Sequence, residues 1–169
     1  MRVYLPATFS MLAELERESV ISCPGGWAFA VTDALREFYS AGGDEEELSE
    51  AAFDQAALAS LRLLAAGAVE RHPHRRVVIS ADVADAAISV SPEQGEAVVR
   101  LDPAEISVEH VAAIHVDIAE AEEATAKAVE LIDAADLGDE DAELAVGDAQ
   151  DNWLAYYAPE ELGALVELL

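Results

Sequence analysis

The sequence predicts a single α+β domain over residues 1–169, in which helices cover a mixed β-sheet. The β-branched run at 77–79 is too short for a helix and is apolar throughout, so we expect a strand near the middle of the sheet. Two strand–helix–strand successions predict βαβ units, whose parallel strands are joined by right-handed crossovers. Residues 87–91 and 97–101 flank a short loop that contains glycine, which predicts one antiparallel hairpin.

Strand and helix signals alternate along the first half of the chain. Pro6 ends the first strand, because proline cannot donate to a strand ladder. Thr8 and Thr32 each precede an apolar helical pattern, as N-cap residues do. The acidic run at 44–47 suits the positive end of a helix dipole. The predicted elements are a strand at 2–5, a helix at 9–17, a strand at 27–31, a helix that ends at 39 and a long helix that begins at 44.

The second half continues with similar signals after the central strand. Ser107 is the predicted N-cap of a short helix. The order strand, helix, strand, helix occurs in both 2–40 and 113–158, which indicates either a weak internal repeat or a chance similarity among short elements. The predicted elements are a strand at 113–117, a helix at 119–135, a strand at 143–146 and helical segments at 153–157 and 159–169.

The chain is strongly acidic, with a formal net charge of −26 and a pI near 4.1. Such a surface repels phosphate backbones and anionic lipids, so we expect neither nucleic acid nor a membrane as a partner. One explanation of the acidity is a solvated surface. A second is the binding of cations or of a basic partner. A third is imitation of nucleic acid, which needs charges along one continuous face.

Cysteine content and hydropathy predict a cytoplasmic protein. Cys23 is the single cysteine, so no intrachain disulfide can form and a reducing compartment fits best. The first residues lack the pattern of a signal peptide, and the apolar segment 56–69 is too short to span a bilayer. Cys23 would be a nucleophile if His110 or His115 were its base, but a lone cysteine is more often a small apolar side chain.

Four aspartates are the strongest candidates for chemistry. Asp82 and Asp117 lie at the C-terminal ends of predicted strands, and Asp148 follows another. Ligands gather beyond such ends in sheets with parallel strands, where carboxylates can hold Mg²⁺ or Ca²⁺. The alternative is that these aspartates terminate strands and cap helices. The candidate metal or ligand residues are Asp82, Asp85, Asp117 and Asp148.

One basic cluster stands in the acidic chain, formed by Arg71, His72, His74, Arg75 and Arg76. Arginine side chains suit bidentate acceptors, so the cluster is a candidate for contact with an anion or a partner. The His-x-His spacing permits a metal, but the adjacent arginines oppose a cation and no third ligand is evident. The alternative is a surface loop whose charges pair with acidic neighbours or with a second protomer.

An aromatic group near the C-terminus is a further candidate. Trp153, Tyr156 and Tyr157 fall at i, i+3 and i+4, so they would share one face of a helix. Such a face can stack on a ligand, and the alternative is an aromatic face packed on the sheet. The polar residues beside it are Asp148, Asp151 and Asn152.

Several motifs carry a resemblance to a known family. They are Met-Arg-Val-Tyr-Leu-Pro-Ala-Thr at 1–8, Arg-Arg-Val-Val with Ala-Asp-Val at 75–83, Asp-Ala-Ala-Asp-Leu-Gly-Asp-Glu-Asp at 133–141, and Val-Gly-Asp-Ala with the aromatic segment at 146–157. On these residues the chain resembles short, acidic, uncharacterised actinobacterial proteins that form a domain of unknown function. The resemblance covers most of the length and implies an actinobacterial cytoplasm. It implies no activity and supplies no catalytic residues.

Recognisable catalytic motifs are missing from the sequence. There is no Gly-rich phosphate-binding loop, no Gly-x-Ser-x-Gly elbow and no paired-cysteine metal site, and we expect no cofactor. The sequence leaves enzyme activity undecided. The first hypothesis is a small cytoplasmic regulatory or protein-interaction module that self-associates as a homo-oligomer. The alternative is a divalent-metal-assisted enzyme or a small-ligand binder that uses the strand-end aspartates.

Overall fold

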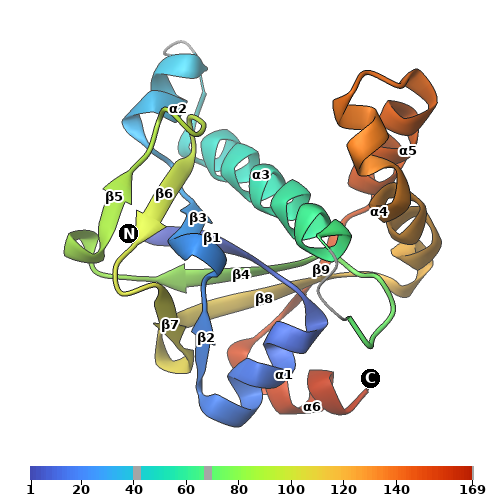
Figure 1. The fold of residues 1–169 in the computed structure, drawn as a ribbon. Coiled ribbons are helices and arrows are strands. Elements are labelled where there is room, and N and C mark those ends of the chain that lie inside the picture. The colour runs from blue at the N-terminus through green and yellow to red at the C-terminus, as the bar shows by residue number, and fades with distance from the viewer. Residues whose placement is uncertain (40–42, 67–69, 169) are drawn as a thin grey trace.

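The computed structural model describes residues 1–39, 43–66 and 70–168, and these residues form the predicted single α+β domain (Figure 1). One sheet has the strand order β5-β6-β3-β1-β4-β8-β9, and β2 pairs with β7 in a second, small sheet. The strands are β1 (Arg2–Ala7), β2 (Val20–Ser22), β3 (Trp27–Phe29), β4 (Val77–Asp82), β5 (Ile88–Val90), β6 (Val98–Leu101), β7 (Glu105–Ser107), β8 (Val111–Asp117) and β9 (Leu154–Tyr157).

The first two helices begin at the predicted caps, and the third begins at the predicted acidic run. Thr8 accepts a hydrogen bond from the N–H of Met11, and Thr32 caps α2 in the same way. Asp44 and Glu47 form a capping box at the start of α3, in which each side chain accepts from the other residue's backbone N–H. The α-helices are α1 (Phe9–Glu18), α2 (Asp33–Phe38), α3 (Glu45–Ala65), α4 (Glu122–Asp136), α5 (Glu140–Gln150) and α6 (Leu162–Glu167).

The helices cover the two faces of the large sheet unequally (Figure 1). On one face, α1 and α6 pack against strand residues such as Leu5, Ile79 and Ile114, and this is the main core. On the other face, α3 packs against Tyr4 of β1 and Val78 of β4. Helices α4 and α5 pack on each other and on α3 instead of on this face. The α3 face is therefore covered over β1 and β4 and open over β8 and β9.

The predicted parallel βαβ crossovers are wrong, because every strand pairing of the described residues is antiparallel. A single helix after a strand carries the chain back to the end of the sheet where that strand began, so the next strand can pair in parallel. A second helix carries the chain to the opposite end again, so the next strand runs antiparallel. Two helices, α4 and α5, separate β8 from β9. Between β1 and β3 the chain forms α1 and then β2, a strand that the sequence did not predict. The segments 2–40 and 113–158 thus differ in element order.

The strand predicted at 143–146 is wrong, because these residues lie inside α5. Asp139 caps this helix by accepting a hydrogen bond of 2.9 Å from the N–H of Ala142. Ala142, Ala145 and Ala149 are buried at helical spacing, and Ala149 packs in one cluster with residues of α3 and α4. Within the predicted strand Ala145 belongs to this buried face whereas Leu144 is exposed, so burial follows the period of a helix.

The helix predicted at 153–157 is also wrong, because Leu154–Tyr157 forms the edge strand β9. Leu154 and Tyr156 face the α3 side, whereas Tyr157 packs against the main core on the opposite side. Other predictions are confirmed: β4 lies between β1 and β8 inside the sheet, and β5 and β6 form the antiparallel hairpin. The predicted C-terminal helix is confirmed as α6, and Leu169 lies outside the described residues.

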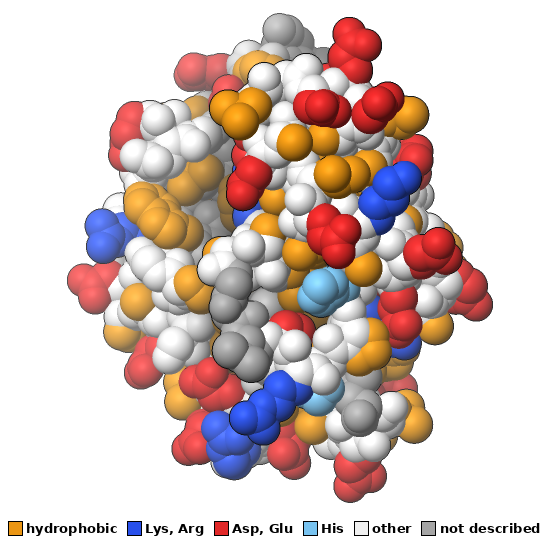
Figure 2. All heavy atoms as spheres, turned by 45° about the vertical axis from the view of Figure 1, so that its right-hand side comes forward, with side chains coloured by type: hydrophobic (Ala, Val, Ile, Leu, Met, Phe, Trp, Pro, Cys, Tyr) orange, Lys and Arg blue, Asp and Glu red, His pale blue; other side chains and the backbone are white. Residues whose placement is uncertain are grey.

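Acidic side chains are spread widely over the surface. They are exposed on α1, α3, α4 and α5, and Figure 2 shows them scattered over the visible face. Because α1 and α3 cover opposite faces of the sheet, the charges do not follow the one continuous face that imitation of nucleic acid requires. Within the described residues, no helix combines the length and the apolar character needed to cross a membrane.

Candidate functional site

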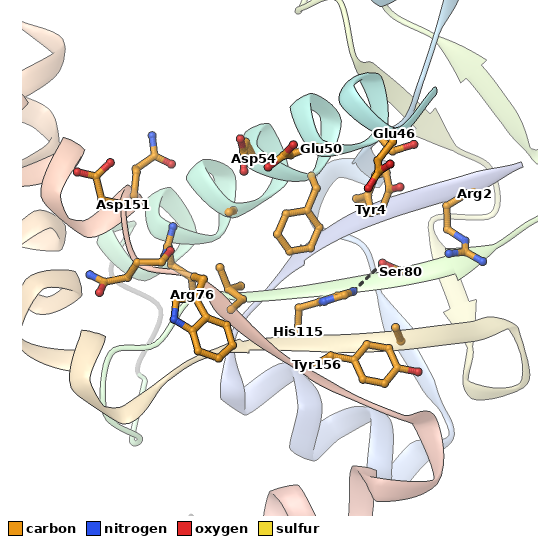
Figure 3. A pocket seen from close by; sticks show the side chains of 18 residues that line it. Arg2, Tyr4, Glu46, Glu50, Asp54, Arg76, Ser80, His115, Asp151 and Tyr156 are labelled. Atoms are coloured by element: carbon orange, nitrogen blue, oxygen red, sulfur yellow. Dashed lines mark hydrogen bonds between the residues drawn. The ribbon is translucent and has the colours of Figure 1, made fainter. Parts of the chain in front are cut away.

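An open cleft lies on the half of the sheet that α3 leaves uncovered (Figure 3). Its volume is about 830 Å³. Strands β1, β4, β8 and β9 form the floor, α3 forms one wall, and the segment between α5 and β9 closes one end. The cleft thus exists because α4 and α5 pack beside α3 and leave β8 and β9 bare on this side.

His115 of β8 lies at the centre of the cleft floor. Its Nε2 atom is 3.1 Å from Oγ of Ser80 on the neighbouring strand β4. Burial, together with the positive charge of Arg2, lowers the pKa of His115, so the imidazole is neutral at pH 7. A neutral imidazole offers one donor and one acceptor. Because Ser80 is buried, its hydroxyl orients His115 and is not open to a substrate.

Aromatic rings surround His115. The ring of Phe53 from α3 meets the imidazole edge to face with centroids 4.8 Å apart, and Tyr156 of β9 approaches from the other side at 5.9 Å. Trp153 and Tyr156 are 66% and 63% exposed, which is unusual for side chains of this size. The cleft therefore has an aromatic floor that is packed beneath α3 and accessible near β9.

Carboxylates of α3 line the wall above this floor. Glu46, Glu50 and Asp54 recur every four residues, so they share one side of the helix, and all three border the cleft (Figure 3). Burial and the nearby charge of Glu50 raise the pKa of Asp54, and Arg76 opposes that rise. Asp151 adds a further carboxylate at the end of the cleft opposite Arg2.

An exposed ion pair occupies one end of the cleft. Arg2 of β1 lies opposite Asp82 of β4 in the sheet, and its Nε and Nη2 atoms donate to the two carboxylate oxygens at 2.7 and 3.1 Å. This hydrogen-bonded pairing holds the pKa of Asp82 below its usual value. Both side chains are about half exposed, so water screens the pair.

A buried ion pair occupies the other end. The Nε and Nη2 atoms of Arg76 donate to the two oxygens of Asp117 at 3.0 and 2.7 Å. Asp117 also accepts from the backbone N–H of Arg76 and from Thr125 of α4. A second hydrogen bond from Nη2 of Arg76 reaches the carbonyl of Asn152, just before β9, at 2.7 Å. This pair joins β4, β8, α4 and the entry to β9, and thereby fixes the cleft floor.

The structure does not bring the four candidate aspartates together. Asp82 and Asp117 end neighbouring antiparallel strands, so they lie at opposite ends of the cleft, and each is paired with an arginine. Asp85 lies 3.1 Å from the N-terminal ammonium group, and Asp148 is exposed on α5. The described residues contain no cluster of three or more His, Cys, Asp or Glu side chains that is placed to hold a metal ion.

The basic cluster is likewise divided by the fold. Arg76 turns inward to Asp117, whereas Nε of Arg75 donates to Glu122 of α4 at 2.6 Å. The guanidinium of Arg75 also lies over the ring of Phe9, 5.9 Å from its centroid. These contacts agree with the alternative in which the charges pair with acidic neighbours. The remaining members are exposed or partly exposed: Arg71, His72 and His74.

Cys23 is unsuited to act as a nucleophile with the candidate histidines. It belongs to the main core on the α1 face, whereas His115 lies on the opposite face of the sheet. Burial raises the pKa of Cys23 to about 12, which leaves the thiol protonated at neutral pH. His110 is exposed in the short 3-10 turn just before β8. Cys23 thus acts as a small apolar side chain.

Sequence reasoning missed most residues of the cleft. Two signals are present in the sequence. Ser80 is the one hydroxyl in the otherwise apolar run of β4, and the four-residue spacing of Glu46, Glu50 and Asp54 marks a charged stripe on α3. Neither signal identifies the missing cover over β8 and β9, which depends on how the helices pack.

Comparison with known proteins adds a family and no activity. The model of a family described as "Family of unknown function (DUF6912)" matches residues 1–166. No curated protein matches the chain, and no solved structure does. Function therefore has to be argued from the cleft.

Proposed function

The chain belongs to the DUF6912 family, and we propose that it is a protein-interaction module whose cleft receives a cationic group of a partner protein. The observation that carries this proposal is a row of carboxylates on α3 above an accessible aromatic floor. The cleft is open along β9, as suits a group presented on the surface of another protein. A regulatory role would follow from the partner's response to binding.

The charge balance of the cleft favours a cation. Its two arginines are each neutralised within the protein, Arg2 by Asp82 and Arg76 by Asp117. The acidic side chains that border the cleft have no basic partner among the described residues. Burial is the main cause of the raised pKa of Asp54, and a bound cation would offset the further rise that comes from the charge of Glu50. The acidic side chains in question are Glu46, Glu50, Asp54 and Asp151.

The floor supports the same ligand chemistry. Cations are attracted to the faces of tryptophan and tyrosine rings, and Trp153 and Tyr156 are both accessible. Neutral His115 adds a hydrogen-bond acceptor when its second nitrogen is unprotonated, and an arginine guanidinium carries five donors. Arginine thus matches both the carboxylates and the rings better than a metal ion does.

Several earlier predictions stay open beside this proposal. Self-association and a cytoplasmic location stay predictions, and light scattering tests the first. A divalent-metal activity that uses Asp82, Asp85, Asp117 and Asp148 also stays a prediction. Calorimetric titration with Mg²⁺, Ca²⁺ and Mn²⁺ tests that activity, and the separation of these aspartates gives it no support.

The test uses two matched small molecules, arginine amide and citrulline amide, both acetylated on the α-amino group. A urea group replaces the guanidinium in the second, so the side-chain charge is the difference between them. We expect arginine amide to shift the amide NMR signals of α3, β8 and β9, and citrulline amide to leave them in place. The variant Glu50→Gln/Asp54→Asn should bind arginine amide about fivefold to thirtyfold more weakly, since each of the two lost charge contacts is worth about 0.5–1 kcal/mol.

The control is Glu16→Gln/Glu18→Gln, which removes the same charge from α1 on the opposite face and should bind as the unaltered protein does. Equal shifts with both amides, or equal loss of affinity in both variants, would overturn the proposal. In the second case the net charge of the protein, and not the cleft, would govern binding.

A further inference from the structure

We propose that the partner of the cleft is an extended basic segment that adds to the sheet as a new strand beside β9. This inference rests on the proposed function and specifies how the cationic group is presented. It makes the peptide backbone, as well as the charge, part of what is recognised. Strand addition to an open sheet edge is an established mode of peptide binding in proteins.

The first argument is the open edge. β9 is the last strand of the large sheet and pairs with β8 along Leu154–Tyr157. No other strand of the described residues pairs with its outer side, and no further backbone hydrogen bond within the described residues engages these four residues. The N–H and C=O groups that point away from β8 are therefore available to another chain.

The second argument is that β9 lacks the usual protection of an edge strand. Exposed edges commonly carry lysine, proline or a bulge that prevents pairing with other chains. β9 has the sequence Leu-Ala-Tyr-Tyr and pairs with β8 in unbroken register from Ile114 to Asp117. Trp153 and Tyr156 are exposed beside it, and aromatic side chains pair well across strands.

The third argument is the position of the edge relative to the carboxylates. Leu154 and Tyr156 point into the cleft, so every second side chain of an added strand would point to the same side. Strands lie about 4.8 Å apart, and an extended arginine side chain reaches further than one such spacing. An arginine of the added strand would therefore lie over Tyr156 in the open part of the cleft, near Asp151 and on the side that the carboxylates of α3 border.

Charge decides which kind of chain pairs with β9. A second copy of this protein would bring its own net charge of −26, and Asp151 and Glu160 flank β9 on either side. Two such edges repel each other, whereas a basic segment is attracted over a long range. The occupant that fits is thus a segment with alternating basic residues in another protein.

The test uses an eight-residue peptide, capped at both ends, in which four arginines alternate with four threonines. Two further versions carry three N-methyl groups each on alternate backbone nitrogens. One frame methylates arginines and the other frame methylates threonines. An added strand turns only one set of its N–H groups toward β9. We expect one methylated frame to bind at least tenfold more weakly than the parent, and the other frame to bind within about twofold of it, because each lost hydrogen bond costs about 0.5–1.5 kcal/mol.

A second measurement is amide hydrogen exchange in β9. The parent peptide should slow exchange of the β9 amides that face outward, and arginine amide should not. Equal affinity of the two methylated frames, with unchanged β9 exchange, would overturn strand addition while leaving the proposed function intact if arginine amide still shifts the cleft signals. If neither the peptide nor arginine amide binds, both the inference and the proposed function fail.

Discussion

Arg2–Asp82 and Arg76–Asp117 are the same kind of ion pair at the two ends of one cleft, and they differ in their access to water. Both are bidentate, with nitrogen–oxygen distances between 2.7 and 3.1 Å. The side chains of Arg2 and Asp82 are 48% and 60% exposed, whereas those of Arg76 and Asp117 are 2% and 0% exposed. The two pairs therefore share the same hydrogen-bond geometry and differ in burial.

Burial gives the two pairs different roles. The exposed pair joins two adjacent strands that are already hydrogen-bonded, so its loss changes little else. The buried pair holds four elements together and satisfies a backbone N–H, a threonine hydroxyl and a backbone carbonyl. A charge left alone at the buried site has no water to replace its partner. The buried pair thus builds the cleft, and the exposed pair only borders it.

The largest expected effect comes from removing one carboxylate of each pair. Asp117→Ala leaves Arg76 charged and unpaired in the interior, and should lower the free energy of unfolding by about 3–5 kcal/mol. Asp82→Ala is the matched control and should lower it by at most about 1 kcal/mol. Urea unfolding at pH 7 measures both. Similar losses in the two variants would mean that burial does not distinguish the pairs.

A smaller effect is expected when each arginine is replaced by lysine. Arg76→Lys keeps the charge but cannot donate to both oxygens of Asp117 and to the carbonyl of Asn152, so we expect a loss of about 1–3 kcal/mol. Arg2→Lys should cost about 0.5 kcal/mol or less, because water replaces the lost contact.

NMR spectra of the same two variants show which part of the structure each arginine holds in place. The Arg76→Lys protein should show altered amide signals in β9, whose entry is held by this arginine, and the Arg2→Lys protein should not. Unchanged β9 signals in Arg76→Lys would contradict the role assigned to the buried pair in fixing the cleft floor.

The smallest effect concerns His115, which lies between the two pairs. Its pKa in the folded protein is lowered by burial and by Arg2, so the unfolded chain takes up the proton first as the pH falls. The stability that neutral His115 contributes is fully present above about pH 6.5, the unfolded pKa, and is lost as the pH falls toward the lowered folded pKa. Urea midpoints at pH 7.5 and 5.5 measure this loss.

Two variants test the cause of that pH dependence. His115→Leu should show a smaller decrease in stability between pH 7.5 and 5.5 than the unaltered protein. Arg2→Gln should show an intermediate decrease, because it removes the charge but keeps the burial. Asp82 offers no explanation in this window, since a carboxylate with a lowered pKa loses its contribution only below about pH 4. An unchanged decrease in His115→Leu would contradict this assignment.

Local signals predicted the fold where neighbouring residues decide the structure. The confirmed predictions include the caps at Thr8 and Thr32, the acidic start of α3, the apolar run of β4 and the β5–β6 hairpin. Predictions failed where the outcome depends on distant partners. The segment 153–157 has aromatic residues at helical spacing, yet it forms a strand because the edge of β8 is available to it.

The candidate site was less predictable than the fold, for a related reason. The prediction that the strand-end aspartates lie together assumed parallel strands. Because β4 and β8 are antiparallel, Asp82 and Asp117 lie at opposite ends of the cleft. That assumption came from the two predicted strand–helix–strand successions, and the second of them fails because residues 143–146 lie inside α5. The cleft itself arises from helices packing beside the sheet, which no local pattern records.

The position of β1 has a consequence for how the chain acquires its structure. β1 is near the middle of the sheet, and its longest pairing is with β4, where Arg2 meets Asp82 and Ala7 meets Val77. During synthesis some seventy further residues are therefore added after β1 before β4 can pair with it. Closing such long loops is slow, because much chain entropy is lost before contacts compensate. We infer that formation of the β1–β4 pair sets the pace of folding, and that one edge of β1 in the nascent chain stays unpaired until β4 has emerged.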